Sequence, residues 1–240
     1  MPADISGKPD ESKSVREATA AALLDRIRSG SLAPGMLLPP ERELAAQLGV
    51  SRGTLREAIR ILDYSGVLDV RTRTGTYVSD GALSKRIELR THAVLLGEES
   101  PLDIMVARRA LEPVSARYAA LNRHVRDLTV LKKSVREQRR LIDIGEDPDE
   151  VDRGFHVAVA IASRNPLLHM LFARVADVMK QRMWMELKHR SRDKGDHQEL
   201  YLQQHKAIID AIEIGDSSAA ARAMIEHLDA VEEGLLAEVD

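Results

Sequence analysis

Apolar residues recur every three or four positions in three stretches near the start of the chain, which predicts three helices. The first covers residues 14–28 and ends at Gly30. The second, ERELAAQL, follows a proline pair and stops at Gly49. The third begins after Ser51, a residue type that caps helix N-termini, and its apolar face carries Leu55, Ile59 and Leu62.

Two short alternating stretches, VLDV and TYVS, follow the third helix and are separated by RTRTG. Alternation of apolar and polar residues on both sides of a turn predicts a β-hairpin. The order helix, helix, turn, helix, strand, turn, strand is that of a winged helix-turn-helix, which we assign to residues 14–80. Residues 1–13 lack such a pattern and are expected to form a disordered tail.

Residues 81–240 show helical periodicity throughout and no further strand signal. Glycine, asparagine and proline residues divide them into seven expected helices, which would pack as an all-α bundle. The expected fold class is therefore mainly α, a winged helix with a small β-hairpin followed by a seven-helix domain. The expected helices are 83–96, 101–122, 124–144, 148–163, 166–190, 196–214 and 217–238.

Composition narrows the possible classes of protein. The 240-residue chain has no cysteine, which excludes disulfides, thiolate zinc sites and cysteine nucleophiles. It has no apolar run of about 18 residues, so we expect no membrane span and a cytoplasmic protein. The net charge of −3 is not that of a general nucleic-acid binder, so any DNA-binding role must depend on local charge.

The third helix carries such a local charge. A recognition helix enters the DNA major groove with its first turns, where side chains reach phosphates and base edges. Those turns hold Arg52, Thr54 and Arg56, and Gly53 allows a close backbone approach. Arg42 on the preceding helix can reach a flanking phosphate, and the hairpin offers two arginines to the minor groove, Arg71 and Arg73. The alternative is an ordinary solvated face whose arginines pair with neighbouring acids.

The run LPPERELAAQLGVSRGTLREAIRILDYSGVL, followed by GTYV, resembles the DNA-binding domain of the GntR family of bacterial transcription regulators over residues 37–78. The family wing reads R-x-G-x-G-T, whereas this chain reads RTRTGT, with Arg73 in place of the first glycine. A stiffer and more cationic wing tip is therefore expected. The resemblance implies that the matching positions contact the operator, namely Arg42, Arg52, Thr54, Arg56 and the wing glycine Gly75.

One carboxylate and three imidazoles on different expected helices form a candidate metal site. Asp152 and His156 are four residues apart and share a helix face. His205 and His227 each lie among apolar residues at helical spacing, which predicts that both point inward. A lone histidine is more often a packing residue, but burying all four groups together would be expensive without a cation. Three nitrogens and one oxygen suit zinc first, with nickel, manganese or iron as alternatives.

The pieces RRALEPVSARYAA, DRGFHVAVAIASRNPLL, QHKAIIDAIEIGD and ARAMIEHL resemble the FCD ligand-binding domain of the FadR-type branch of the GntR family. The resemblance implies that the matching Asp and three His bind a divalent metal, beside which a small carboxylate or sugar-acid effector would bind. It also points to Arg108 as the residue that holds the effector carboxylate, although Arg108 could instead pair with Glu112. Weaker candidates for the pocket wall are Asn165, Arg182 and Trp184.

Two other functions stay open. A metal-dependent hydrolase could use such a site to activate water, but no HExxH, G-x-S-x-G or phosphate-loop motif accompanies it, so we expect no enzyme. An acyl-CoA sensor without metal is the second alternative. The favoured interpretation is a metabolite-responsive repressor whose homodimer binds a near-palindromic double-stranded operator. The effector would shift the two winged helices and so change the operator affinity.

Overall fold

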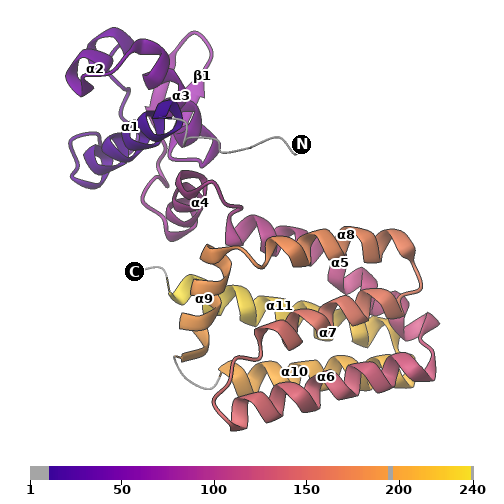
Figure 1. The fold of residues 1–240 in the computed structure, drawn as a ribbon. Helices are drawn as coiled ribbons and strands as arrows, with labels where there is room; N and C mark the ends of the chain where they lie inside the picture. Colours follow the sequence, from indigo (N-terminus) through magenta and orange to yellow (C-terminus); the bar gives the residue numbers. More distant parts are fainter. Residues whose placement is uncertain (1–10, 194–196, 239–240) are drawn as a thin grey trace, which may run out of the picture. The chain divides into compact units, whose positions relative to one another are not determined.

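A computed structural model describes residues 11–193 and 197–238, in which the chain forms eleven helices and one two-stranded sheet. The chain divides into two compact units, Met1–Glu98 and Glu99–Asp240 (Figure 1). The first unit contains α1 (Glu11–Arg28), α2 (Glu41–Leu48), α3 (Arg52–Tyr64), β1 (Leu68–Arg71), β2 (Gly75–Val78) and α4 (Lys85–Leu96). The second contains α5 (Pro101–Asn122), α6 (Val125–Asp143), α7 (Asp149–Ala162), α8 (Pro166–Val178), α9 (Arg182–Asp193), α10 (His197–Ile214) and α11 (Ser217–Ala237).

Helix α1 begins at Glu11, inside the segment expected to be a tail, and residues 1–10 of that segment lie outside the described residues. None of the described helices is long and apolar enough to cross a membrane. In the first unit, α1 packs on α3, and α2 reaches α3 through a tight turn. Gly49 makes this turn with a left-handed φ of 66°. Ser51 then caps α3 by accepting a hydrogen bond from the Thr54 N–H at 3.0 Å.

Strands β1 and β2 form the expected wing as an antiparallel pair, with the register running from Leu68 opposite Val78 to Arg71 opposite Gly75. The turn between them carries Arg73 with a φ of +71°, a left-handed conformation that side-chain-bearing residues rarely adopt. Together with α2 and α3, this hairpin confirms the winged helix-turn-helix fold.

Helix α4 exists as expected, but its contacts belong to the first unit. Ser84 caps it, and its Ile87 and Leu95 pack against the apolar core formed by α1, α3 and the wing. The division into compact units therefore falls after Glu98, whereas the sequence placed the domain boundary after residue 80.

The single helix expected over residues 166–190 was wrong, because the structure ends α8 at Val178 and begins α9 at Arg182. The N–H groups of Lys180 and Gln181 donate to carbonyls three residues back, which tightens the last turn of α8. The Gln181 side chain then accepts a hydrogen bond from the Glu99 N–H at 2.9 Å. No glycine or proline marks this break in the sequence, whereas the contact between Gln181 and Glu99 accompanies it.

The second unit is a bundle of seven helices, α5–α11, as many as expected but with α4 outside it and α9 counted separately. Helix α5 packs on α7, α8, α10 and α11, while α6 covers α7 and α10 (Figure 1). Helix α9 packs on α10 and α11. Among the described residues of this bundle, five ionisable side chains are only 0–2% exposed, namely Arg108, Glu112, His156, His205 and His227.

Candidate metal centre and DNA-binding surface

The three histidines of the predicted metal site come together inside the helical unit. His156 lies on α7, His205 on α10 and His227 on α11, and all three are 0–1% exposed. Each offers a ring nitrogen within 4.8 Å of those of the other two. The Nε2 atoms of His205 and His227 are 3.3 Å apart. Three helices distant in sequence therefore bring three imidazoles to one point.

The Nδ1 atom of each histidine faces an oxygen from another side chain. Gln138 Oε1 lies 3.0 Å from His205 Nδ1, and Gln204 Oε1 lies 3.1 Å from His227 Nδ1. His156 Nδ1 lies against the Glu112 carboxylate. An oxygen acceptor at Nδ1 places the proton there and leaves Nε2 with its lone pair.

Asp152 lies at the edge of this histidine group. Its Oδ1 atom is 3.5 Å from His205 Nε2 and 4.0 Å from His156 Nε2. Its Oδ2 atom faces the ammonium of Lys188 at 3.7 Å. Asp152 is 7% exposed, so both contacts form in a region largely closed to water.

Burial and charge fix the protonation states of these groups. Burial lowers the pKa of His205 to about 3 and lowers the pKa of His227 well below its ordinary value. Burial alone would raise the pKa of Glu112, but Arg108 and His156 hold it at about 2. Burial also opposes ionisation of Asp152, yet the ammonium of Lys188 keeps the pKa of Asp152 below the usual range. The carboxylates are therefore charged and both imidazoles are neutral at pH 7.

A divalent cation suits this donor set. Nitrogens about 2.0–2.1 Å from a tetrahedral zinc ion are about 3.3–3.4 Å apart, which matches the separation of His205 Nε2 and His227 Nε2. With both protons on Nδ1, these two atoms present lone pairs to each other and cannot form a hydrogen bond. A cation between them would resolve this repulsion, so the residues present fit a metal ion.

Arg108 forms the ion pair with Glu112 that the sequence left as one of two alternatives. It is 0% exposed, and its Nε donates to Glu112 Oε1 at 2.5 Å. Its Nη2 lies 3.2 Å from His156 Nε2, so the guanidinium also reaches the histidine group. The ring of Trp184 lies 5.6 Å from the guanidinium carbon, within the range of a cation–π contact.

Two of the predicted pocket-wall residues have other contacts. Asn165 caps α8, where its side-chain oxygen accepts from the N–H groups of Leu167 and Leu168 at 3.0 and 3.3 Å. The Arg182 side chain is 72% exposed and pairs with Glu186 at 2.8 Å. Neither contact involves the histidine group, because each residue serves the end or outer face of its own helix.

Sequence reasoning missed the polar residues that hold the site. Gln138 on α6 is 3% exposed, and Lys188 on α9 is 4% exposed, although both residue types usually face water. Their helices also carry many exposed charges, so no pattern in the chain singles them out. Only Gln204 had a local signal, because it directly precedes His205.

The first turn of α3 presents the predicted DNA-contacting residues on the surface. Arg52, Gly53 and Arg56 are exposed, and Thr54 is half-buried beside the Ser51 cap. Arg56 Nε donates to Glu41 Oε2 at 2.7 Å, so this arginine has an intramolecular partner. A Cβ added to Gly53 would meet only Ser51 Oγ, at an ordinary 3.7 Å. Packing within the chain therefore does not require glycine at this position.

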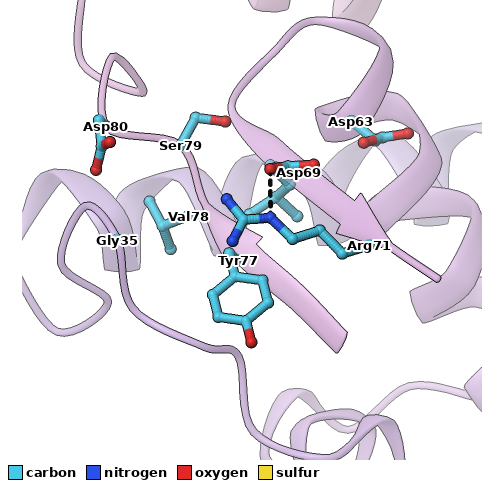
Figure 2. Close-up of a pocket in the computed structure, with 9 residues that line it drawn as sticks. Gly35, Asp63, Asp69, Arg71, Tyr77, Val78, Ser79 and Asp80 are labelled. Atoms are coloured by element: carbon cyan, nitrogen blue, oxygen red, sulfur yellow. Dashed lines mark hydrogen bonds and ion pairs between the residues drawn. The ribbon is translucent and has the colours of Figure 1, made fainter. Parts of the chain in front are cut away.

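The wing holds its two predicted arginines differently. Arg71 Nε donates to Asp69 Oδ2 at 2.7 Å, and its guanidinium lies 4.4 Å from the centre of the Tyr77 ring (Figure 2). Arg71 lines an open hollow of about 580 Å³ together with three acids, Asp63, Asp69 and Asp80 (Figure 2). Arg73 is exposed at the tip. Of these acids, which the sequence interpretation did not consider, Asp69 gives Arg71 an intramolecular partner.

Gly75 has a structural requirement of its own. Its φ is +114°, and an added Cβ would lie 2.6 Å from Leu37 Cδ1. Leu37 forms an isolated bridge with Tyr77 and so packs against the wing. A side chain at position 75 would therefore strain the wing backbone.

Comparison with known proteins agrees with this architecture. Residues 103–230 match the model of the FCD domain, and residues 15–78 match that of bacterial regulatory proteins of the gntR family. The Uxu operon transcriptional regulator of Escherichia coli (strain K12) is 33% identical over 219 residues, 90% of this chain and 84% of the relative. The putative L-lactate dehydrogenase operon regulatory protein of the same strain is 34% identical over 224 residues, 85% and 81% of the two chains.

A solved structure shares the fold. The transcriptional regulator (GntR family member) from Pseudomonas syringae pv. tomato str. DC3000 matches with a TM-score of 0.54 and 22% identity. The match covers 93% of this chain and 85% of that one. With a winged helix-turn-helix that matches one family model and a helical unit that matches the other, the chain belongs to the GntR family of bacterial regulatory proteins and is a DNA-binding transcription regulator with an FCD domain.

Proposed function

We propose that the protein is a metabolite-responsive repressor that acts as a homodimer on a near-palindromic operator. Two winged helices related by a two-fold axis would read two half-sites in successive major grooves. The start of α3 supports this role because Arg52 and Arg56 are exposed there. The residues proposed to contact DNA are Arg42, Arg52, Gly53, Thr54, Arg56, Arg71, Arg73 and Gly75.

The helical unit is proposed to bind one divalent metal ion through Asp152, His156, His205 and His227. The observation that carries this proposal is the convergence of buried imidazoles whose Nδ1 atoms all face oxygen acceptors. Zinc suits the donors best, with nickel, manganese or iron as alternatives. Such an ion would supply a Lewis-acid position that takes a carboxylate or hydroxyl oxygen of an effector.

The effector is proposed to be a small carboxylate or sugar acid held by Arg108. A guanidinium binds a carboxylate through two parallel hydrogen bonds. Arg108 now shares its donors between Glu112 and His156 Nε2. His156 Nε2 has one lone pair, so it cannot ligate a metal and accept from Arg108 together. Occupation of the metal site would therefore free the Nη2 edge of Arg108 for the effector.

Two further observations favour a small polar effector over an acyl-CoA. The name of one relative refers to an L-lactate dehydrogenase operon, and lactate is a small hydroxy acid. The centre of the bundle is lined by charged and imidazole groups, whereas an acyl chain needs an apolar channel. Trp184 would form part of the pocket wall beside Arg108.

The first experiment measures metal content per chain by plasma mass spectrometry after dialysis without chelator. About one divalent ion per wild-type chain is expected, lost in the His205→Ala/His227→Ala double variant. A matched control is His169→Ala, since His169 lies outside the histidine group on α8. Wild-type protein that stays free of metal after resupply with zinc and nickel would refute the metal site.

A second experiment tests the DNA half. Duplexes selected from a random pool by the full-length protein would give the operator sequence, and fluorescence anisotropy would then measure affinity. Arg52→Ala is expected to weaken binding about tenfold or more, because a base or phosphate contact is worth about 1–3 kcal/mol. Arg60→Ala, on the same helix but beyond its first turns, is the control. Unchanged binding by Arg52→Ala would exclude the proposed use of α3.

A further inference from the structure

Lys188 is a buried lysine whose ammonium forms no hydrogen bond within the described part of the chain. It lies on α9, is 4% exposed, and its Nζ is 3.7 Å from Asp152 Oδ2. The Tyr201 ring centre lies 4.6 Å from the same nitrogen. A charge-assisted hydrogen bond from an ammonium to a carboxylate is about 2.7–2.9 Å long, so the contact with Asp152 is too long to be one.

A buried ammonium with three unused donors is costly, and its position shows where an acceptor would fit. A small cavity of about 20 Å³ lies beside it, lined also by Gln138, Asp152 and Tyr201. This volume admits about one oxygen-sized group. Lys188 therefore points its charge at a space next to the proposed metal ligand Asp152.

Arg108 and Lys188 flank the histidine group at two different edges. Arg108 Nη2 is 3.2 Å from His156 Nε2, whereas Lys188 Nζ faces the outer oxygen of Asp152. Trp184 and Lys188 are four residues apart on α9, so one face of this helix covers both edges. A ligand beneath α9 could meet both cations.

The charged side chains around the histidine group, together with a divalent ion, would balance two further negative charges. Two cationic side chains, Arg108 and Lys188, and two carboxylates, Glu112 and Asp152, are buried around the histidine group. A divalent ion would leave an excess of two positive charges in a buried region. Asp149 also lines the cavity, and its Oδ2 atom lies 3.6 Å from His189 Nε2.

We infer that Lys188 is a second effector anchor, so that the effector is a small hydroxy-dicarboxylate with one carboxylate at Arg108 and the other at Lys188. This inference rests on the proposed function, because it requires metal and effector in the same site. It narrows the effector class from carboxylates in general to those with two acidic ends. It also assigns Lys188 a role that a simple counter-ion of Asp152 would not have.

The test compares ligands that differ in one carboxylate. The pairs are L-lactate with L-malate and D-gluconate with D-glucarate, titrated into zinc-loaded full-length protein. Trp184 is the only tryptophan of the chain and lies beside Arg108, so its fluorescence reports binding. Wild type is expected to bind the dicarboxylate of at least one pair about tenfold or more tightly than its partner, the effect of one charged hydrogen bond.

Lys188→Met is expected to weaken dicarboxylate binding about tenfold more than monocarboxylate binding, and so to abolish this selectivity. Lys188→Arg is expected to keep part of the selectivity, because the charge remains. The matched control is Lys180→Met, which removes an ammonium from a side chain that is 58% exposed and should change nothing. Thermal unfolding of each variant checks that it folds.

Equal binding of both members of each pair by zinc-loaded wild type would overturn the inference alone. Selectivity for the dicarboxylate that persists in Lys188→Met would also overturn the inference. A parallel loss in this variant of monocarboxylate affinity, dicarboxylate affinity and bound zinc would do the same, because it would mark Lys188 as a counter-ion of Asp152. Zinc retained without binding of any of the four acids would overturn it as well. Absence of both zinc and carboxylate binding in wild type would refute the proposed function itself.

Discussion

Individual residues of this protein are held in states that their type does not favour. Arg73 has a left-handed φ of +71° at the wing tip, and His205 is a fully buried imidazole beside a second one. Each state has a free-energy cost that the surrounding structure must offset. Such residues are the places where a single substitution separates folding from function.

Replacing Arg73 by glycine should stabilise the wing. A side chain in the left-handed region costs about 1–2 kcal/mol, and glycine removes that cost at some loss of chain entropy. The free energy of unfolding of Arg73→Gly is expected to be about 0.5–1 kcal/mol higher than that of Arg73→Ala. Arg73→Ala is the matched control because it loses the same charge but keeps the backbone strain. Urea denaturation measures the difference, and both variants should lose operator affinity equally. A less stable glycine variant would contradict the backbone explanation.

Acid should destabilise the metal-free protein through its buried histidines. The pKa of His205 falls from 6.5 to about 3 on folding, so the unfolded chain binds more protons between these values. The free energy of unfolding should therefore be constant above about pH 7 and decrease as the pH falls below 6.5. Each such histidine contributes on the order of 1 kcal/mol per pH unit. His227 acts in the same direction.

Thermal melts of wild type and His205→Asn from pH 8 to pH 4, in the presence of chelator, would check this. The variant should show a smaller loss of melting temperature below pH 6.5, because it has one fewer group to protonate. The control is His124→Asn, because His124 is the exposed N-cap residue just before α6. Identical slopes for wild type and His205→Asn would mean that this imidazole does not titrate as proposed.

At the scale of elements, each helix of the site depends on a neighbour for its orientation. His205 on α10 is oriented by Gln138 on α6, and His156 on α7 is oriented by Glu112 on α5. Helix α9 contributes Trp184 and Lys188 from one face. The pairing of helices therefore decides which imidazole nitrogen is available.

Loss of Gln138 should weaken metal binding without removing a ligand. Partners that fix the tautomer of a ligating histidine typically account for a factor of about 10–100 in metal affinity. Gln138→Ala is expected to raise the zinc dissociation constant by that factor, measured by competition with a chelator of known affinity. Gln203→Ala is the control, since the Gln203 side chain donates to Glu199 on the exposed side of α10, the helix that carries His205. An unchanged constant would show that Gln138 is merely a packing residue.

Sequence periodicity located most elements correctly but failed where tertiary contacts set a boundary. The strong amphipathic pattern and the cap at Ser51 marked α3. The break between α8 and α9 has no local signal in the sequence. It is accompanied by a hydrogen bond between Gln181 and Glu99, which are far apart in the chain. Likewise, the sequence assigned α4 to the helical domain, whereas its Ile87 and Leu95 pack against the apolar core of the first unit.

At the scale of the whole molecule, two compact units divide the chemistry. The first unit presents arginines outward, and the second buries charges and imidazoles. Binding of a ligand to one folded unit stabilises that unit by mass action. The metal proposed for the second unit should therefore leave a thermodynamic signature that the first unit does not share.

Chelation should lower the stability of the helical unit selectively. Zinc at about 100 times its dissociation constant would add about 2.7 kcal/mol to the free energy of unfolding. Unfolding followed by the fluorescence of Trp184, which lies in the second unit, should shift to lower temperature in EDTA. The His205→Ala/His227→Ala variant should show no shift. An EDTA effect of equal size in that variant would mean that the metal binds elsewhere.

The sequence by itself determined the two-part architecture, the family and the identity of the candidate residues. Helical and strand periods, caps and turn glycines are local properties, so they can be read without coordinates. It also predicted that His205 and His227 point inward, because apolar neighbours at helical spacing mark the buried face of each helix.

Only the tertiary structure decided how those residues meet. It placed Gln138 and Gln204 behind two imidazoles, gave Arg108 both Glu112 and His156, and excluded Asn165 and Arg182 from these contacts. It also revealed the buried ammonium of Lys188 on a helix whose composition suggests solvent exposure. Such contacts join distant parts of the chain, and their energies depend on distance and burial, which the order of residues does not specify.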